Sequence, residues 1–208
     1  MAENENSEDK PENITIELGS IPMTASVGTG TIWLSYSFAK EWFEDALHEA
    51  RTGTDHNARR REIVFAVCFA ESYLFEWIRD EVLDPRDYQK LVTDLNQYFP
   101  PGEGQPVKDK WKLVPKKLLS AGLVPAVPDL NQPYWEHFTK LVTMRNGLVH
   151  ARSSRPETTQ IQEKEKPLPS KEDLDNLPAG WATEVVVTLV KELHKAVGTS
   201  EPDWLVTP

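Results

Sequence analysis

The chain contains a single cysteine, Cys68, among its 208 residues, so no disulfide can form within it. A lone cysteine fits a reducing compartment, and we expect a cytoplasmic protein. No basic segment followed by an apolar one opens the sequence, so a signal peptide is not expected. The longest apolar run, residues 63–70, is far too short to cross a bilayer. We therefore expect no membrane partner.

Basic residues are also scarce, since 23 Lys and Arg face 33 Asp and Glu and give a formal net charge of −10. This balance argues against a general nucleic-acid binder, because Lys and Arg supply phosphate affinity. The charge is uneven, however. Residues 1–17 hold six acidic residues and one lysine, whereas residues 140–156 hold Lys140, Arg145, Arg152 and Arg155 and no acid. The sequence thus predicts a local basic patch on an acidic body.

Patterns for metals and cofactors are missing as well. The histidines at positions 48, 56, 137 and 194 show no spacing with cysteines or acids that is typical of a zinc site. The "GTGT" at 28–31 lacks the lysine of a phosphate-binding loop and reads as a linker. We expect neither a metal nor a cofactor.

What the sequence does contain is helical periodicity, which predicts an all-α bundle of about five to six helices. Residues 1–30 are expected to be an acidic, mostly disordered segment, with "ITIELGSIP" as a weak short strand. A helical domain should fill residues 31–199, with a surface loop over 153–176, and residues 200–208 form a tail whose Trp204 and Leu205 could dock on it. The expected helices lie near residues 32–51, 57–82, 85–98, 108–121, 131–150 and 177–197.

One stretch, "RNGLVHARSSR" at 145–155, carries charge where the fifth helix should be apolar. On a helical wheel Arg145 falls near the centre of the apolar arc, a place from which charge is normally excluded. Asn146 and His150 are four residues apart and share one line along the edge of that arc, so both can act on one group.

The second helix has a matching irregularity, because Glu71 falls on an apolar side of a helix that is apolar all round. A buried carboxylate must be paired, protonated or placed in a cleft. We predict an ion pair between Glu71 and Arg145. Two plainer interpretations stay open: the pair is purely structural, or Arg145 lies at a subunit contact.

The motif "RNGLVH" resembles that of the HEPN superfamily, in which an arginine, often followed by a polar residue, precedes a histidine on the last core helix. "CFAESYLFEWI" is similar to the earlier HEPN helix whose acid supports that arginine. The resemblance covers residues 32–197 and implies a HEPN-like helical bundle. It implies that Arg145, Asn146, His150 and Glu71 form the site of a metal-independent endoribonuclease, a type of enzyme found among toxins and antiviral effectors.

The residue types suit that chemistry. RNA cleavage without a metal uses the 2′-hydroxyl as the nucleophile, so the protein must supply a proton acceptor and a cation. His150 suits acid–base work near neutral pH, and Arg145 can bind a phosphate oxygen and stabilise the transition state. Arg152, Arg155 and Lys140 would bind the RNA backbone.

The resemblance also implies partners. We expect RNA, a homodimer that pairs two motifs across a two-fold axis, and an antitoxin or other regulatory protein. Two rival hypotheses remain. One is a non-catalytic HEPN-like scaffold that binds a nucleotide or a protein, and the other is an unrelated helical interaction protein.

Overall fold

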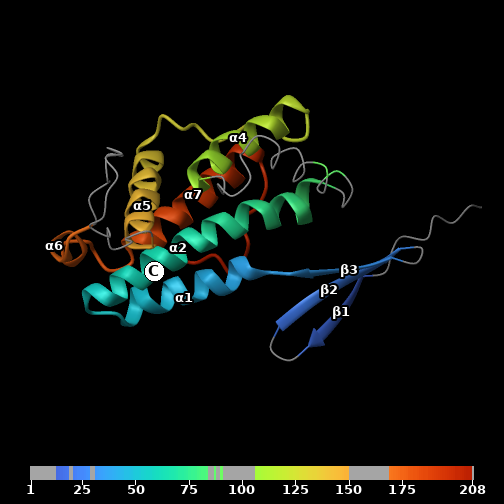
Figure 1. Ribbon diagram of the computed structural model, residues 1–208. Helices are drawn as coiled ribbons and strands as arrows, with labels where there is room; N and C mark the ends of the chain where they lie inside the picture. The colour runs from blue at the N-terminus through green and yellow to red at the C-terminus, as the bar shows by residue number, and fades with distance from the viewer. Residues whose placement is uncertain are drawn as a thin grey trace, which may run out of the picture. The chain divides into compact units, whose positions relative to one another are not determined.

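The computed structural model describes two compact units, which are residues 1–38 and residues 39–208 (Figure 1). Each unit is described by itself. Within them the described residues are 13–18, 21–28, 31–83, 87, 90, 106–149 and 169–207.

The first unit holds a three-stranded antiparallel sheet of strands in sequence order. Strand β1 (Asn13–Leu18) pairs with β2 (Ile21–Gly28), and β2 pairs with β3 (Thr31–Tyr36). The short strand expected at "ITIELGSIP" is confirmed for its first part, which is β1, whereas its last two residues already belong to β2. The expectation of a mostly disordered segment over residues 1–30 is wrong for the described strands.

The first helix, α1 (Phe38–Thr52), begins later than expected. Residues 32–36 were predicted to be helical, but they belong to β3. The sequence "TIWLSY" is rich in β-branched and aromatic residues, which favour strands once a neighbouring strand is present to pair with them. A helical wheel shows one segment alone, so it cannot show that β2 is available to pair with residues 31–36.

The second unit is helical, and the predicted all-α bundle is confirmed for it. After α1 come α2 (His56–Trp77), its π-helical continuation η1 (Ile78–Val82), α4 (Val107–Ser120), α5 (Pro133–Val149), α6 (Lys171–Asp175) and α7 (Trp181–Val197). The second, fourth and fifth helices end within a residue or two of their predicted bounds. The helix expected over residues 85–98 lies largely outside the described residues.

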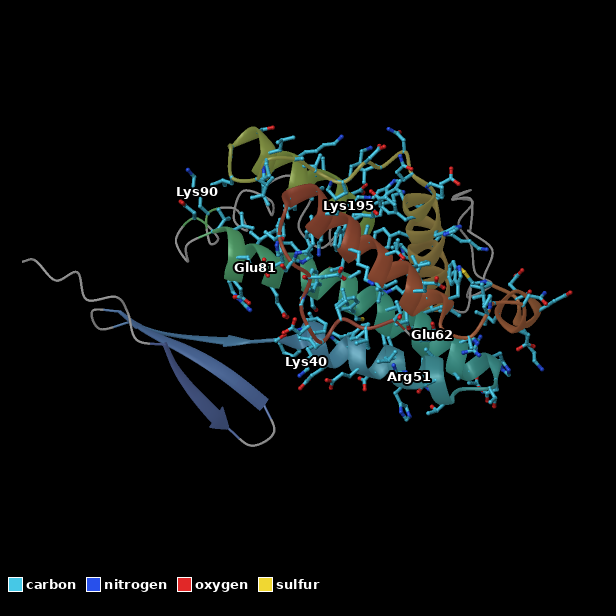
Figure 2. All side chains as sticks on the ribbon, turned by 180° about the vertical axis from the view of Figure 1, so that it is seen from behind. Lys40, Arg51, Glu62, Glu81, Lys90 and Lys195 are labelled. Carbon is cyan, nitrogen blue, oxygen red and sulfur yellow. The ribbon has the colours of Figure 1, made fainter. Side chains whose placement is uncertain are left out.

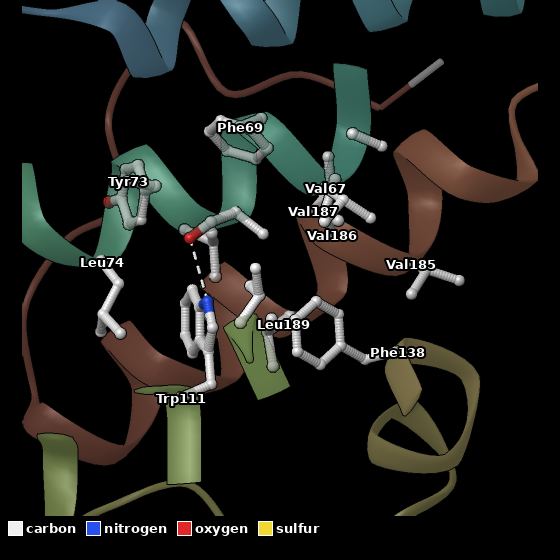
Figure 3. Packing of buried hydrophobic residues seen from close by; sticks show 14 of the residues in the cluster. Val67, Phe69, Tyr73, Leu74, Trp111, Phe138, Val185, Val186, Val187 and Leu189 are labelled. Atoms are coloured by element: carbon white, nitrogen blue, oxygen red, sulfur yellow. Dashed lines mark hydrogen bonds between the residues drawn. The ribbon is translucent and has the colours of Figure 1, made fainter. Parts of the chain in front are cut away.

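Helix α2 is the central element, in contact with α4, α5, α6 and α7. It is buried on several sides, as its apolar sequence predicts, and small side chains such as Ala66 and Ala70 let neighbouring helices approach. The indole of Trp111 on α4 donates a hydrogen bond of 2.9 Å to the carbonyl oxygen of Ala70. This bond lies inside the main cluster of apolar side chains, among Leu74, Phe138 and Leu189 (Figure 3).

Local sequence explains where the helices begin and end. The Asp55 carboxylate caps the N-terminus of α2, because it accepts from the backbone N–H of Ala58 at 2.8 Å. That hydrogen bond lowers the pKa of Asp55. At the start of α7, Gly180 has a φ of 80°, a left-handed conformation that glycine adopts without strain.

Two expectations for later segments need correction. Helix α4 was expected to be kinked or split at Pro115, but it runs through that residue as one element. The predicted surface loop over 153–176 contains a helix, α6, whose first turn is closed by a capping box between Ser170 and Asp173. A polar helix of this length has too few apolar residues to show a period, so its cap is the main sequence signal.

The C-terminal tail docks, as predicted. Leu205 is buried, and the Trp204 ring packs against Phe43, Phe69 and Tyr73 at centroid distances of 5.7, 6.1 and 6.2 Å. In the part of the chain that the structure describes, no helix combines the length and the apolar character needed to span a bilayer.

Candidate functional site

Arg145 lies in the last two turns of α5 and is half-buried. Its Nη1 donates a hydrogen bond of 3.1 Å to the side-chain oxygen of Asn146. Its Nε is buried and has no hydrogen-bond partner among the described residues. A guanidinium carries five N–H donors, and among the described residues the Nε donor has no acceptor. Arg145 therefore keeps a donor that can serve an anion.

The neighbour of Arg145 on α2 is Cys68, a residue that the helical wheel did not point to. Burial raises the pKa of the Cys68 thiol, and the charge of Arg145 and a hydrogen bond from it oppose that rise. The Arg145 side chain thus points toward α2, as its position on the apolar arc predicted. The thiol offers it a weak hydrogen-bond contact and no charge.

Glu71 does not form the predicted ion pair with Arg145. Its carboxylate pairs with the amine of Lys110 on α4, and no ion pair joins it to Arg145 within the described chain. The Lys110 amine also lies 5.4 Å from the centre of the Phe75 ring. The helical wheel places Glu71 on a face of α2, but it cannot tell which neighbouring helix covers that face.

Glu71 and Arg145 nevertheless both lie near Cys68. Cys68 and Glu71 are one turn apart on α2, and the negative charge of Glu71 adds to the rise in the Cys68 pKa. A row of groups therefore runs across three helices. It starts at Arg145 on α5, crosses α2 through Cys68 and Glu71, and ends at Lys110 on α4.

Lys140 is expected to bind substrate, but it lies on another side of α5, because five residues turn a helix by about 140°. Its amine is 5.5 Å from the centre of the Trp181 ring at the start of α7. It lines a surface cavity of about 340 Å³ together with Asp173 and Leu177.

Three of the predicted site residues, His150, Arg152 and Arg155, lie outside the described residues. Of the predicted site residues in the "RNGLVH" motif, the structure therefore describes Arg145 and Asn146, which it places together.

The deeply buried carboxylate of α2 is Glu62, which sequence reasoning missed. Only 1 % of it is exposed, and it lies near the start of α7 (Figure 2). It accepts from the backbone N–H groups of Gly180 and Thr183 at 3.3 and 3.1 Å, and from the Thr183 hydroxyl at 3.2 Å. Arg59 approaches it at 3.4 Å. Glu62 therefore stabilises the N-terminus of α7, where a negative charge is favourable.

A second buried polar group sits at the other end of α7. The Tyr73 hydroxyl lies 2.5 Å from Nε2 of His194, and Nδ1 of His194 lies 2.7 Å from the Thr199 hydroxyl. Burial raises the pKa of Tyr73 and lowers that of His194. The phenol is therefore the donor to Nε2, and a neutral imidazole donates through Nδ1 to Thr199. This chain of hydrogen bonds satisfies each of the three side chains and holds the end of α7.

Within the described ranges, no group of three or more His, Cys, Asp or Glu side chains is arranged to hold a metal ion. The chain matches no known family model, no curated protein and no solved structure. The function therefore has to be argued from the residues of the chain itself.

Proposed function

We propose that the chain is a HEPN-type, metal-independent endoribonuclease that cleaves single-stranded RNA through attack by the 2′-hydroxyl. The observation that carries this proposal is Arg145, a half-buried arginine of the "RNGLVH" motif with an unused Nε donor and no carboxylate partner among the described residues. An arginine that served only as a structural ion pair would have an acid beside it. One without an acid is suited to receive a phosphate.

In this mechanism Arg145 binds a non-bridging phosphate oxygen and stabilises the charge that develops as the 2′-oxygen attacks phosphorus. His150 follows Asn146 by four residues on the motif and acts as the general base or acid. Asn146, which already accepts from Arg145, fixes the direction of the guanidinium. The products are a 2′,3′-cyclic phosphate and a free 5′-hydroxyl.

Because Glu71 pairs with Lys110 and not with Arg145, its proposed role differs from the one that the resemblance implies. Its pairing with Lys110 makes it a link between α2 and α4. It then acts on Arg145 through the electrostatic field near Cys68 and makes no direct contact with the guanidinium. Arg152 and Arg155 remain proposed contacts for the RNA backbone on either side of the cleaved bond, and a homodimer and a regulatory protein such as an antitoxin remain proposed partners.

The test is cleavage of a mixed RNA pool by the full chain in EDTA. Wild-type protein should yield cyclic-phosphate ends, and Arg145→Ala and His150→Ala should abolish cleavage. Matched controls are Arg60→Ala, an exposed arginine on α2, and His137→Ala, an exposed histidine on α5; both should cleave like wild type. If all five proteins cleave equally, a contaminating nuclease is responsible and the proposal fails. Light scattering on the same samples tests the proposed dimer.

A second candidate is a non-catalytic scaffold that binds a nucleotide. It is favoured by the Lys110–Glu71 pair, because that pair leaves Arg145 without the acid that supports the arginine in the resemblance. Wild-type protein that is inert on RNA but binds ATP or GMP in calorimetry, with loss of binding in Arg145→Ala, would select this function.

A further inference from the structure

Helix α4 carries an unusual charge for this chain. It contains five lysines and one aspartate, a net charge of +4 in a chain whose net charge is −10. Residues 110–128 contain no acidic residue at all. The positive charge is therefore concentrated on α4 itself, and no acid in the following loop offsets it.

Three of these lysines form a line along the helix. Lys108, Lys112 and Lys116 follow one another at intervals of four residues, which places them on one side of α4 with about 6 Å of rise between neighbours. Lys112 and Lys116 are exposed and Lys108 is half-buried. None of the three forms an ion pair with any described residue. We refer to these three residues as the lysine line.

The lysine line weakens the helix that carries it, because like charges four residues apart repel one another. No ion pair joins the lysine line to Asp109, the one acidic residue of α4, or to any other described acid. A line of ammonium groups without an ion-pair partner among the described residues is complementary to a chain of phosphates, to which lysines bind as point charges.

Exposed leucines border the lysine line. Leu113, Leu119 and the following Leu123 are 38, 39 and 47 % exposed. Leu113 and Leu119 lie about 120° apart around the helix, with Lys112 and Lys116 between them. Insertion into a lipid surface requires one continuous apolar face, which this arrangement lacks. Lysines at the centre of a surface are also unfavourable for a protein interface. A polyanion that carries sugar and base surfaces beside its phosphates fits this arrangement. Its phosphates can contact the lysines, and its sugars and bases can contact the leucines.

We infer that the lysine line binds the phosphate backbone of single-stranded RNA and forms an extended substrate-binding surface on α4. This inference rests on the proposed function, and it adds a contact region separate from the "RNGLVH" motif. The lysine line lies on the side of α4 away from Lys110, because two residues turn a helix by about 200°. It is therefore a surface of its own, separate from the row of groups that ends at Lys110.

The experiment measures binding of a fluorescein-labelled 20-nucleotide oligo(U) by anisotropy at several NaCl concentrations. Full-length His150→Ala protein is used so that the RNA stays intact. The α4 variant adds Lys108→Gln, Lys112→Gln and Lys116→Gln. Each phosphate contact on a single strand contributes about −0.7 to the slope of log K against log salt. Loss of three contacts should make the slope shallower by about 2. Between 50 and 200 mM NaCl, the parent should then lose about 20-fold more affinity than the α4 variant.

A matched control removes the same charge elsewhere. Lys40, Lys191 and Lys195 each lie in an ion pair of the described chain. Replacing these three with glutamine changes the net charge equally and should leave the slope like that of the parent. Equal slopes for parent and α4 variant, or equal losses in the α4 and control variants, would overturn the inference. So would a parent protein that does not bind the oligonucleotide.

Two further measurements test the inference: one uses a single substitution, and the other uses different anions. The single change Lys112→Gln, at an exposed position, should reduce the slope by about 0.7 if the triple variant is unstable in circular dichroism. Poly-glutamate and phosphatidylserine vesicles serve as alternative anions, and binding of either one that depends on the lysine line more strongly than RNA binding does would contradict the inference. Cleavage is scored separately in the His150 wild-type background. Loss of RNA binding on α4 and absence of cleavage are therefore independent outcomes.

Discussion

Replacing Glu62 with alanine should destabilise the helical unit more than any surface substitution. The carboxylate accepts from two backbone N–H groups and one hydroxyl at the start of α7, and it pairs with Arg59. Alanine leaves these donors buried without an acceptor. Breaking a buried charged pair by removing one partner costs about 3–5 kcal/mol. Because a domain has a total stability of about 5–15 kcal/mol, this loss is a large fraction of it.

Glu62→Gln removes the negative charge of the side chain and keeps nearly the same shape, so it separates the two contributions. The amide oxygen can still accept from one N–H group, so we expect a smaller loss of about 1–3 kcal/mol. The assay is urea denaturation followed by far-ultraviolet circular dichroism, with the slope of unfolding free energy against urea kept as a check on two-state behaviour. In thermal melts, Glu62→Ala should lower Tm by roughly 6–20 °C.

The matched control is Glu44→Ala on α1. Glu44 pairs with Lys40 at 3.8 Å on the surface, and both side chains are largely exposed. Such a pair contributes about 0.3–0.5 kcal/mol. If Glu62→Ala and Glu44→Ala lower the unfolding free energy by amounts within 1 kcal/mol of each other, the α7 N-terminus does not depend on the Glu62 carboxylate and the reasoning is wrong.

Other predictions follow from the same structure. Tyr73→Phe leaves Nε2 of His194 without a donor and should cost about 1–3 kcal/mol in urea denaturation. Because burial lowers the pKa of His194, the unfolded chain binds a proton near its ordinary value of about 6.5 before the folded chain does. Stability should therefore fall as pH drops below about 6.5, and His194→Gln should remove that part of the pH dependence. A Cβ at Gly53 would lie 2.2 Å from the nearest side-chain carbon, so Gly53→Ala should lower the unfolding free energy by about 1–3 kcal/mol. Glu71→Gln should slow RNA cleavage less than about tenfold, whereas Arg145→Ala abolishes it; equal losses in single-turnover assays would restore Glu71 as a direct partner of Arg145.

The long helices α2, α4, α5 and α7 were predictable because each has a clear local signal, whereas the short α6 is too polar to show a period. The apolar residues of α2 recur all round the helix, which indicated a central position, and Asp55 supplied a recognisable cap. The direction of Arg145 also followed from helical periodicity, since its side chain reaches α2 at Cys68.

The contacts between side chains of different helices and strands were not predicted correctly. A wheel shows that Glu71 faces a neighbour, but the choice between Arg145 and Lys110 depends on how α4 packs against α2. Glu62 was missed for a related reason. Its sequence context, "RRRE", is typical of a charged surface turn, and only the packing of α7, more than a hundred positions away, makes Glu62 a buried acceptor. The strands β2 and β3 depend in the same way on a partner that local propensity does not contain.

The docking of Trp204 on Phe43 has a consequence for how the protein is made. The ribosome releases α1 and α2 long before the aromatic side chain that covers them is synthesised. Until the codon for Trp204 is translated, Phe43, Phe69 and Tyr73 lack the indole that packs on them in the folded protein. Contacts of such long sequence separation also slow folding. A stop codon, or a nuclease cut in the message, anywhere before the codon for Trp204 would therefore yield a chain with an open aromatic surface on α1 and α2.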